Sequence, residues 1–577
     1  MTTIQRNSRI TDAVNWEDPS PELLGALEKI ERDFTVDATK LREITEQFEQ
    51  ELRNGLKKNE TNIAMEVTWV KGLPTGKETG SFLTIDLGGT NLRVCWITLH
   101  GKDHEIEVVQ DSYKLPKEVK KGEASELWSM ISEFVENFVE KHELRNTNGD
   151  RLPLGFTFSY PASQDWIDHG TLRTWTKGFD ITGVEGENVV AQLRGAMEER
   201  KLPVEIVALI NDTTGAMMAS AYKDPETIIG AIFGTGCNAA YMENIGSIPK
   251  LETSLHPDTP MAINCEYGAF DNAHTVLPRT KYDIAIDDNS PRPGEQAFEK
   301  MSAGLYLGEI FRLVALDLFE RKLMFKGQDC SKLREAYHLD TGFLSALEHE
   351  SHDEVVARYQ EELKITPTSD DIKLSRHLAI VIATRGARLC TCGVAAICRK
   401  KGLKSGHVAA DGSVANKHPG FKARWAEALG EILGWPKDRK SDPITMTSAL
   451  DGSGIGAAVI SAMSVSGLAV KASNSPDAWN MFTLLLHAAP ATSSTVIFFN
   501  PATAYTTLFV KQLSFFSLNI HVAFHLSLFL LAGSEGAFAR YLFAIPNVAF
   551  ISPHGASVSI CRFSSGIAAT MSKLSRS

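Results

Sequence analysis

LGFTFSYPASQDWIDHGTLRTWTKGF, residues 154–179, combines an apolar strand, a backbone bend and a polar pair between aromatic rings. The strand covers 154–158, and the bend at 159–161 presents polar groups where the strand ends. The stretch closes with Thr176 and Lys177, which place a hydroxyl beside an ammonium group. Small polar groups held between rigid apolar residues are typical of a site for a small polyol. The alternative, a strand and loop with an ordinary surface lysine, stays open for this stretch taken alone.

The composition of the whole chain indicates a soluble globular protein. Its 577 residues are enough for two or more domains, and 43% are hydrophobic while 23% are charged. A formal net charge of −12 argues against a nucleic-acid partner. The eight cysteines are scattered, which favours reduced thiols, and the N-terminus lacks the apolar core of a signal peptide. We therefore expect a cytoplasmic protein.

The composition changes abruptly at about Val465. Only eight of the residues from 465 to 577 are charged, and 512–534 contains no Asp, Glu, Lys or Arg. That run is just long enough to span a bilayer, but its histidines, asparagine and serines make it a poor membrane helix. Val465-Ser466 can also be encoded by GTRAGT, which resembles a splice donor. We favour translated intron or out-of-frame sequence for this tail, and a tail anchor or an extra subdomain are the alternatives.

Residues 72–94 contain one false phosphate motif and one credible one. GLPTGKE, residues 72–78, resembles a P-loop, but its glycine spacing is one residue short and Glu78 stands where a Ser or Thr must ligate magnesium. We interpret it as a loop or hinge. FLTIDLGGTNLRV, residues 82–94, predicts a strand, a tight glycine turn and a second strand. Since no helix follows, this is a phosphate-binding β-hairpin rather than a dinucleotide-binding turn.

Strands and helices alternate along the rest of the chain. We expect strands that end in polar residues at 206–210 and 228–233, and the segment 261–268 repeats the pattern of a strand that delivers a polar residue. Helical patterns occupy 22–56, 126–141 and 216–222 and most of 296–401. This order predicts an α/β protein with a cleft between domains.

Four glycine-rich turns, at 88–90, 234–236, 412–413 and 452–456, are suited to a triphosphate held by backbone amides. With its other motifs the chain closely resembles the hexokinase family of the actin-like ATPase superfamily, and most of all the fungal single-unit hexokinases. The resemblance covers about 23–463 and rests on motifs that occur in the family's order. They are IDLGGTNLRV, LGFTFSYP, WTKGF, INDTTG, GTGCNAAYME, NCEYGAFDN, PRPGEQAFEKMSAGLYLGEIFRL, ADGSV and DGSGIGAA.

The resemblance implies a two-domain actin-like ATPase fold, of the ribonuclease H-like type, with a ligand cleft between a small and a large domain. The expected parts are an N-terminal helical segment on the large domain (1–74), the small domain (75–210), the large domain (211–451), a helix returning to the small domain (452–464) and the atypical tail (465–577). Hinges are expected near 73–76, 211–215 and 449–452.

The implied reaction is phosphorylation of D-hexoses by ATP at the 6-hydroxyl, the first step of glycolysis, with glucose, mannose and fructose as candidate sugars. Mg²⁺ would arrive with the nucleotide, so no protein metal site is expected. The partners would be the hexose and MgATP, with no nucleic acid or membrane, and the protein would be a monomer or a homodimer. The alternative is a catalytically silent, glucose-binding regulatory relative. The family's reactive residues are retained here, which favours the enzyme.

The resemblance assigns two catalytic residues. Asp212 would be the general base that takes the proton of the 6-hydroxyl as it attacks the γ-phosphate. Lys177 would bind the sugar and place positive charge near the transferring phosphoryl group. An N-cap role for Asp212 is compatible with this chemistry. Besides these two, the residues expected to bind the sugar are Ser159, Thr176, Asn211, Asn238, Glu266, Gln296 and Glu299.

The residues expected to bind the nucleotide share backbone amides, hydroxyls or charge. Asp86 would position the magnesium ion through water. Thr341, Ser413 and the turn at 452–454 would border the adenosine. The full set is Asp86, Gly88, Gly89, Thr90, Asn91, Arg93, Thr235, Thr341, Gly412, Ser413, Gly452 and Ser453.

Overall fold

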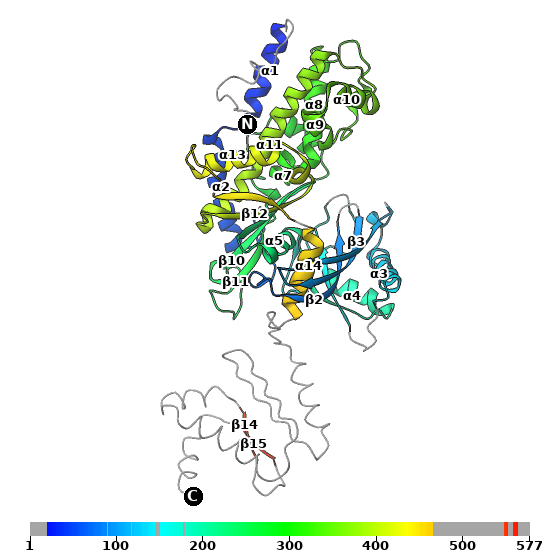
Figure 1. Ribbon diagram of the computed structural model, residues 1–577, viewed down its shortest axis with the longest axis vertical. Helices are drawn as coiled ribbons and strands as arrows, with labels where there is room; N and C mark the ends of the chain where they lie inside the picture. Colours follow the sequence, from blue (N-terminus) through cyan, green and yellow to red (C-terminus); the bar gives the residue numbers. More distant parts are fainter. Residues whose placement is uncertain are drawn as a thin grey trace. The chain divides into compact units, whose positions relative to one another are not determined.

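The computed structural model describes residues 20–88, 91–116, 118–144, 151–176, 179–449 and 451–465, together with two short strands near the C-terminus (Figure 1). The chain divides into two compact units, Met1–Val470 and Lys471–Ser577. In the second unit, β14 (Asn547–Ile551) and β15 (Val558–Arg562) pair antiparallel. The interpretations proposed for the tail otherwise lie outside the described residues.

A five-stranded sheet forms one half of the first unit, in the order β4-β3-β2-β5-β8. β2 and β3 form an antiparallel hairpin in which Ile85 pairs with Val94, which confirms the predicted strand–turn–strand. Helices α3 and α4 pack on one face and α14 packs on the other (Figure 1). The strands are β2 (Thr79–Leu87), β3 (Asn91–His100), β4 (Glu107–Lys114), β5 (Leu152–Phe158) and β8 (Val204–Ile210), and the helices are α3 (Ala124–Lys141), α4 (Val189–Glu199) and α14 (Gly452–Met463).

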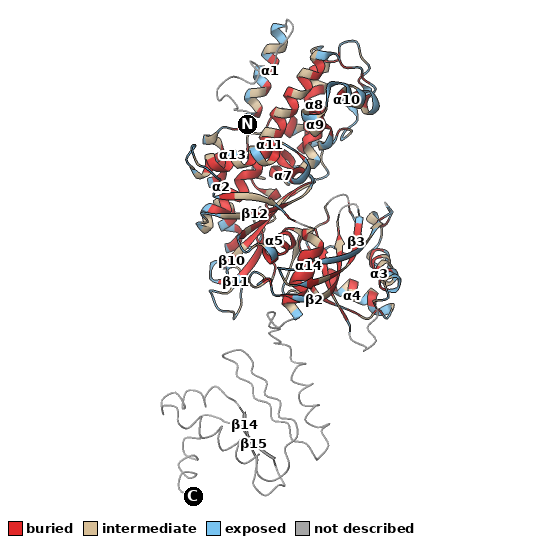
Figure 2. Cartoon of the chain, in the orientation of Figure 1, coloured by how far each residue is buried: buried red, intermediate tan, exposed pale blue. Residues whose placement is uncertain are grey.

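A six-stranded sheet forms the other half, in the order β1-β11-β10-β9-β12-β13. β9, β12 and β13 run parallel, and the remaining neighbours run antiparallel. Helices α2, α11 and α13 cover one face with a large apolar core, whose buried residues Figure 2 shows in red. The strands are β1 (Glu66–Val67), β9 (Thr227–Phe233), β10 (Cys237–Asn244), β11 (Pro260–Asn264), β12 (Gly406–Asp411) and β13 (Ile444–Ser448), and the covering helices are α2 (Ala38–Lys57), α11 (Ser369–Lys401) and α13 (Phe421–Leu433).

A second apolar core forms around the N-terminal half of α11. The helices that build it are α1 (Pro21–Phe34), α6 (Lys281–Asp288), α8 (Gly304–Glu320), α9 (Thr341–His349) and α10 (His352–Arg358). The short helices α7 (Ala297–Ser302) and α12 (Ser413–Lys417) contribute instead to the core on the six-stranded sheet. The short elements are β6 (Ala162–Ser163), β7 (Thr171–Leu172), the 3₁₀ turns Val119–Lys121, Ile245–Ser247, Tyr267–Ala269 and Ser331–Arg334, and a π-turn at Tyr359–Leu363.

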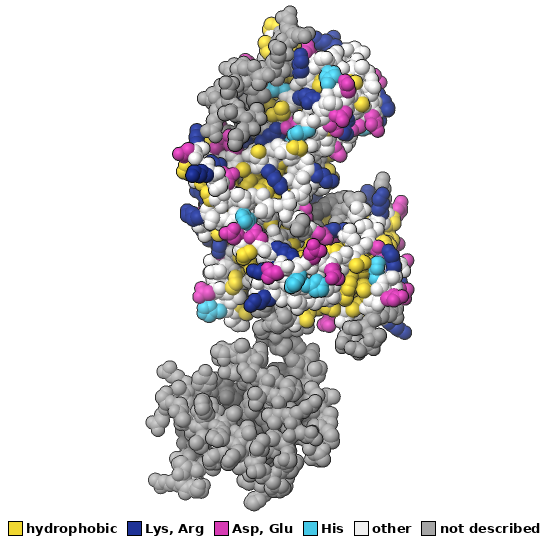
Figure 3. Space-filling model, viewed as in Figure 1, with side chains coloured by type: hydrophobic (Ala, Val, Ile, Leu, Met, Phe, Trp, Pro, Cys, Tyr) yellow, Lys and Arg dark blue, Asp and Glu magenta, His cyan; other side chains and the backbone are white. Residues whose placement is uncertain are grey.

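Among the described helices, only α11 is long and apolar enough to cross a membrane. However, 83% of its most apolar window is buried inside the protein. Burial of this extent is typical of a core helix, so α11 is weak grounds for a membrane span. On the face seen in Figure 3, acidic and basic side chains are interspersed over the described surface rather than gathered by sign.

α5 (Asp212–Lys223) connects the two sheets. It lies directly on β9, because a Cβ at Gly230 would be 2.4 Å from the carbonyl oxygen of Thr213. It also crosses α14 at glycines, since a Cβ at Gly456 would be 2.2 Å from the carbonyl oxygen of Gly215. The two backbones approach this closely only where neither helix carries a side chain. The crossing therefore links the six-stranded sheet to the helix that packs on the five-stranded sheet.

The helical pattern expected at 22–56 is confirmed, and it forms two helices because Asp37 starts α2 as an N-cap that accepts from the backbone N–H of Lys40 at 2.8 Å. A helix is also present at Gly452–Met463, where one was expected at 452–464. The glycine turn expected at 452–456 was wrong, because these residues are the first part of α14, where glycine serves helix packing rather than a bend.

The predicted loop at 72–78 contains neither helix nor strand and ends directly before β2. Glu78, which argued against a P-loop, accepts hydrogen bonds at Oε1 from the backbone N–H and the hydroxyl of Thr75, at 2.8 and 2.9 Å. The predicted boundary between residues 210 and 211 falls between the end of β8 and the start of α5. The domain division itself stays a prediction.

Candidate active site

The end of β8 delivers the two residues at the centre of the site. Asn211 is the N-cap of α5, and its Oδ1 accepts from the backbone N–H of Thr213 at 2.9 Å. Asp212 is the first residue of the helix, and its Oδ1 accepts from the same N–H at 2.8 Å. A buried apolar strand, an Asx cap and a helix start thus position a half-buried carboxylate at a helix N-terminus.

Three amide side chains converge on the carboxylate of Glu266. Its Oε1 accepts from Nδ2 of Asn264 at 2.7 Å, of Asn238 at 3.3 Å and of Asn211 at 3.4 Å. The backbone of Glu266 is left-handed (φ 54°), and its N–H donates to Oδ1 of Asn238 at 2.9 Å. The amides come from β10, β11 and the cap of α5, so the cluster exists only when these elements meet. Such a set of amides and carboxylates is suited to a ligand with several hydroxyls.

Two glycines make room for the side chains of Glu299 and Gln296, which precede α8 in the sequence. Oε2 of Glu299 accepts from the backbone N–H of Cys237 at 3.1 Å, and a Cβ at Gly236 would lie 2.6 Å from that oxygen. A Cβ at Gly268 would lie 2.3 Å from Oε1 of Gln296. Gln296 and Glu299 therefore border the same strand ends as Asn238 and Glu266.

Arg93 joins two carboxylates on the hairpin side of the site. Its Nη2 lies 2.7 Å from Asp86 Oδ2 and 2.8 Å from Asp451 Oδ1. Burial raises the pKa of Asp86; Arg93 lowers it, and the charges of Asp212 and Asp451 add to the effect of burial. We expected Arg93 to donate to phosphate, and here its guanidinium instead holds β2, β3 and the residue before α14 together. Its nucleotide role stays a prediction.

Two glycine turns meet between β9 and β12. A Cβ at Gly234 would lie 3.2 Å from Cα of Gly412, which has φ 107°. The backbone N–H of Leu305, at the start of α8, donates to the carbonyl oxygen of Thr235 at 3.2 Å. The turn before β10, the turn after β12 and the start of α8 are thus packed together.

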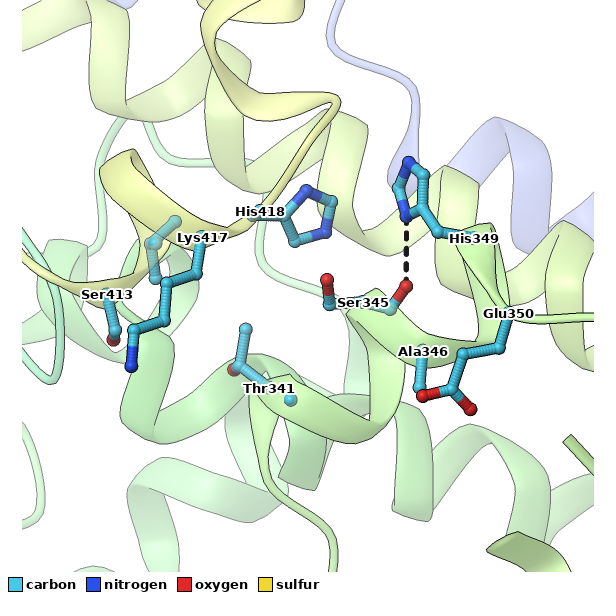
Figure 4. A pocket seen from close by; sticks show the side chains of 10 residues that line it. Thr341, Ser345, Ala346, His349, Glu350, Ser413, Lys417 and His418 are labelled. Atoms are coloured by element: carbon cyan, nitrogen blue, oxygen red, sulfur yellow. Dashed lines mark hydrogen bonds between the residues drawn. The ribbon is translucent and has the colours of Figure 1, made fainter. Parts of the chain in front are cut away.

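A cavity of about 290 Å³ lies beside these turns (Figure 4). Thr341 and Ser413, which were predicted to border the adenosine, both line this cavity. Residues 452–454, which were predicted to border the adenosine with them, do not line it. Thr341 also donates its hydroxyl to the carbonyl oxygen of Gly304 at 2.5 Å. The remaining lining residues are Gly342, Ser345, Ala346, His349, Glu350, Val414, Lys417 and His418.

The remaining predicted site residues lie on loops, at the ends of strands and helices, or outside the described residues. Lys177, Gly89 and Thr90 lie outside the described residues. Ser159 is buried after β5, Thr176 is half-buried, and Asn91 is exposed at the start of β3. Gly88 accepts at its carbonyl oxygen from the hydroxyl of Tyr160 at 3.1 Å, and the carbonyl oxygen of Ser453 accepts from the hydroxyl of Thr157 at 2.9 Å. These assignments stay predictions.

The sequence reasoning missed two residues. Asn264 links the sugar-side residues, because its Oδ1 accepts from Nδ2 of Asn238 at 2.8 Å and from the hydroxyl of Thr213 at 3.0 Å. Asp451 pairs with Arg93, as described above. Asn264 carried a usable signal, since it is the polar residue that ends a strand of buried residues. The only sequence signal at Asp451 was its position directly before a glycine-rich motif.

Comparisons with known proteins agree with this geometry. Two family models described as hexokinase match residues 26–222 and 228–463. The chain is 55% identical over 466 residues to a hexokinase of Emericella nidulans, which covers 80% of this chain and 94% of the relative. It is 52% identical over 455 residues to Hexokinase-1 of Saccharomyces cerevisiae, covering 78% and 93%.

A solved structure gives the same result in three dimensions. The hexokinase of Schistosoma mansoni complexed with glucose superposes with a TM-score of 0.70 at 33% identity, covering 76% of this chain and 99% of that one. The family match ends at Met463, the last residue of α14. These relatives are aligned over nearly their whole length, so almost none of their sequence is left to correspond to the tail.

Proposed function

The chain belongs to the hexokinase family and is an ATP-dependent hexose kinase, and we propose how its residues carry out the transfer. The acceptor is the 6-hydroxyl of D-glucose, and the product enters glycolysis. The glucose complex of a relative at 33% identity supports glucose as a substrate. Mannose and fructose are proposed as further substrates, because one set of hydroxyl-binding groups serves all three sugars.

One observation carries the mechanism: Asp212 directly follows Asn211, whose amide donates to Glu266, and the side chains of both residues accept from the backbone N–H of Thr213. We infer that the cluster binds the sugar hydroxyls while Asp212 accepts the proton of the 6-hydroxyl as its oxygen attacks the γ-phosphorus. The N-terminus of α5 interacts favourably with the negative charge that Asp212 needs as a base. Lys177 would add positive charge beside the transferring group.

The cluster also supports selectivity for a polyol. Glu266 and Glu299 accept hydrogen bonds from hydroxyls, and the asparagines both donate and accept. A ligand that lacks one of these hydroxyls would leave a polar group of the site unpaired, which costs binding free energy. This explains why several amides, rather than apolar side chains, meet at the strand ends.

We propose that MgATP binds along the glycine turns, with its base in the cavity between Thr341 and Ser413. The backbone N–H groups of such turns suit phosphate oxygens, and the carboxylate of Asp86 would position the Mg²⁺ ion through a water molecule. When bound, the ion would neutralise charge on the β- and γ-phosphate oxygens. The chain's own residues would orient the nucleotide and exclude water, because water competes with the sugar as an acceptor.

We propose that the crossing of α5 and α14 is a hinge for domain closure. The base stands at the start of α5, and α14 packs on the sheet that carries Asp86 and Ser159. Closure upon sugar binding would bring the two halves of the site together and limit hydrolysis of ATP. We further propose a cytoplasmic protein that acts as a monomer or homodimer.

The test is an assay of ATP-dependent hexose 6-phosphate formation, with Asp212→Asn as the key variant. We expect the variant to lower kcat by roughly 10²–10⁴-fold, the usual contribution of a general base, while glucose binding measured by calorimetry persists. Near-normal turnover in Asp212→Asn would remove Asp212 from the base role. Sugar binding by the wild-type chain without any product would instead favour the silent regulatory relative.

A further inference from the structure

Two separate elements supply the polar walls of the nucleotide cavity. Thr341 and Ser345 belong to α9, and Ser413 and Lys417 belong to α12 (Figure 4). In Figure 4 the two groups stand on different helices that face each other across the cavity. A nucleotide that contacts both walls needs a constant separation between these helices.

The carboxylate of Glu348 connects the two walls. It lies on α9, one residue before the cavity residue His349. Its Oε1 is 3.3 Å from Nε2 of His418, just after α12, and its Oε2 is 2.5 Å from Nη2 of Arg424 on α13. Oε1 also accepts from Nη1 of Arg424 at 3.2 Å, so the arginine binds the carboxylate with both nitrogens.

This connection is buried and charged. The side chains of Glu348 and His418 are 5% and 3% exposed, and that of Arg424 is 19% exposed. Burial raises the pKa of Glu348, but His418 and Arg424 outweigh burial and lower it to about 2. The carboxylate is therefore ionised at neutral pH. Gly420 makes room for Arg424, the partner of Glu348, because a Cβ at position 420 would lie 2.9 Å from Cζ of Arg424.

We propose that Glu348 is a positioning residue for the nucleotide, which fixes the separation of the Thr341 and Ser413 walls through His418 and Arg424. The inference rests on the proposed binding of the nucleotide base in this cavity. Glu348 does not itself line the cavity and acts through its partners. The residues expected to bind the sugar do not belong to α9, α12 or α13, so loss of the connection should weaken ATP binding and leave sugar binding unchanged.

The experiment measures KM for ATP, KM for glucose and kcat in the full chain carrying Glu348→Gln. Removal of the charge is expected to raise KM for ATP about tenfold, equivalent to about 1.4 kcal/mol, with the other two constants within about twofold. The matched control is Glu309→Gln. Glu309 pairs with Arg312 on α8, both side chains are 5% exposed, and neither residue lines the cavity. This control should lower the unfolding temperature without a selective rise in KM for ATP.

A second variant keeps the proposal testable if Glu348→Gln folds poorly. Arg424→Met should raise KM for ATP by a similar factor, and the double variant should resemble either single one, because all three lose the same connection. An unchanged KM for ATP in folded variants would overturn the proposal. The proposal would also be overturned if Glu348→Gln lowered kcat and raised both KM values by similar factors, and if Glu309→Gln did the same. Failure of the proposed function is distinct, since the wild-type chain would then form no hexose 6-phosphate.

Discussion

Replacing Gly456 by alanine tests whether the close crossing of α5 and α14 holds the active site in place. Alanine favours a helix over glycine by about 0.8–1 kcal/mol. Against this, the new methyl group would lie 2.2 Å from the carbonyl oxygen of Gly215 and 2.4 Å from its Cα. Such contacts are with backbone, so one helix must move. Overpacking of a core costs about 1–3 kcal/mol, which leaves a net loss of up to about 2 kcal/mol.

The same displacement should reach the reaction. Gly215 lies on the first turn of α5, whose first residue is Asp212. Because a misplacement of about 1 Å can cost about 100-fold in rate, we expect Gly456→Ala to lower kcat at least about tenfold.

Thermal unfolding and a coupled assay of glucose phosphorylation measure both effects. The control is Gly25→Ala on α1, where the added Cβ would have no atom within 4 Å among the described residues beyond its chain neighbours and the backbone of its own helix. It should stabilise the protein slightly by helix propensity and leave kcat unchanged. A Gly456→Ala protein that unfolds at or above the wild-type temperature with normal kcat would refute the account of the crossing.

Three further predictions concern stability and the tail. Arg385→Met should destabilise the protein by about 3–5 kcal/mol in urea unfolding, because it leaves the 1%-exposed carboxylate of Asp283 without its arginine; a loss below about 1 kcal/mol would contradict this. Acidification from pH 4.5 to 2 should remove up to about 3 kcal/mol of folding stability through Glu348. The pKa of Glu348 in the folded protein, about 2, lies below its ordinary value of 4.5. The stabilisation by Glu348 is therefore fully present above pH 4.5 and is lost as the pH falls towards 2. Glu348→Gln should therefore show a shallower acid loss than wild type in unfolding measured at several pH values, and equal slopes would count against the pairing. A chain ending at Val465 should phosphorylate glucose with unchanged kcat, since the family match ends at Met463; an inactive but folded product would show that the tail contributes to the enzyme.

The order of strands, turns and helices could be predicted from local patterns. The run of buried residues at 206–210 followed by Asn211 and Asp212 gave a strand, a cap and a helix start, which is how the structure forms β8 and α5. The hairpin at 82–94 followed from the same reasoning. Boundaries were less predictable at 35–37, where an N-cap divides an otherwise continuous helical pattern.

The sequence by itself determined the family, the reactive residue types and the elements that carry them, because motifs and hydrophobic periodicity act over short distances along the chain. Only the tertiary structure decided which side chains meet. Asn264 and Asp451 acquire their roles from partners far away in the sequence, and Arg93 faces carboxylates that local patterns do not reveal. The same holds for Glu348, whose ionised state depends on His418 and Arg424 being buried against it. Long-range contacts set burial and charge pairing, and these are properties of the packed fold rather than of any segment.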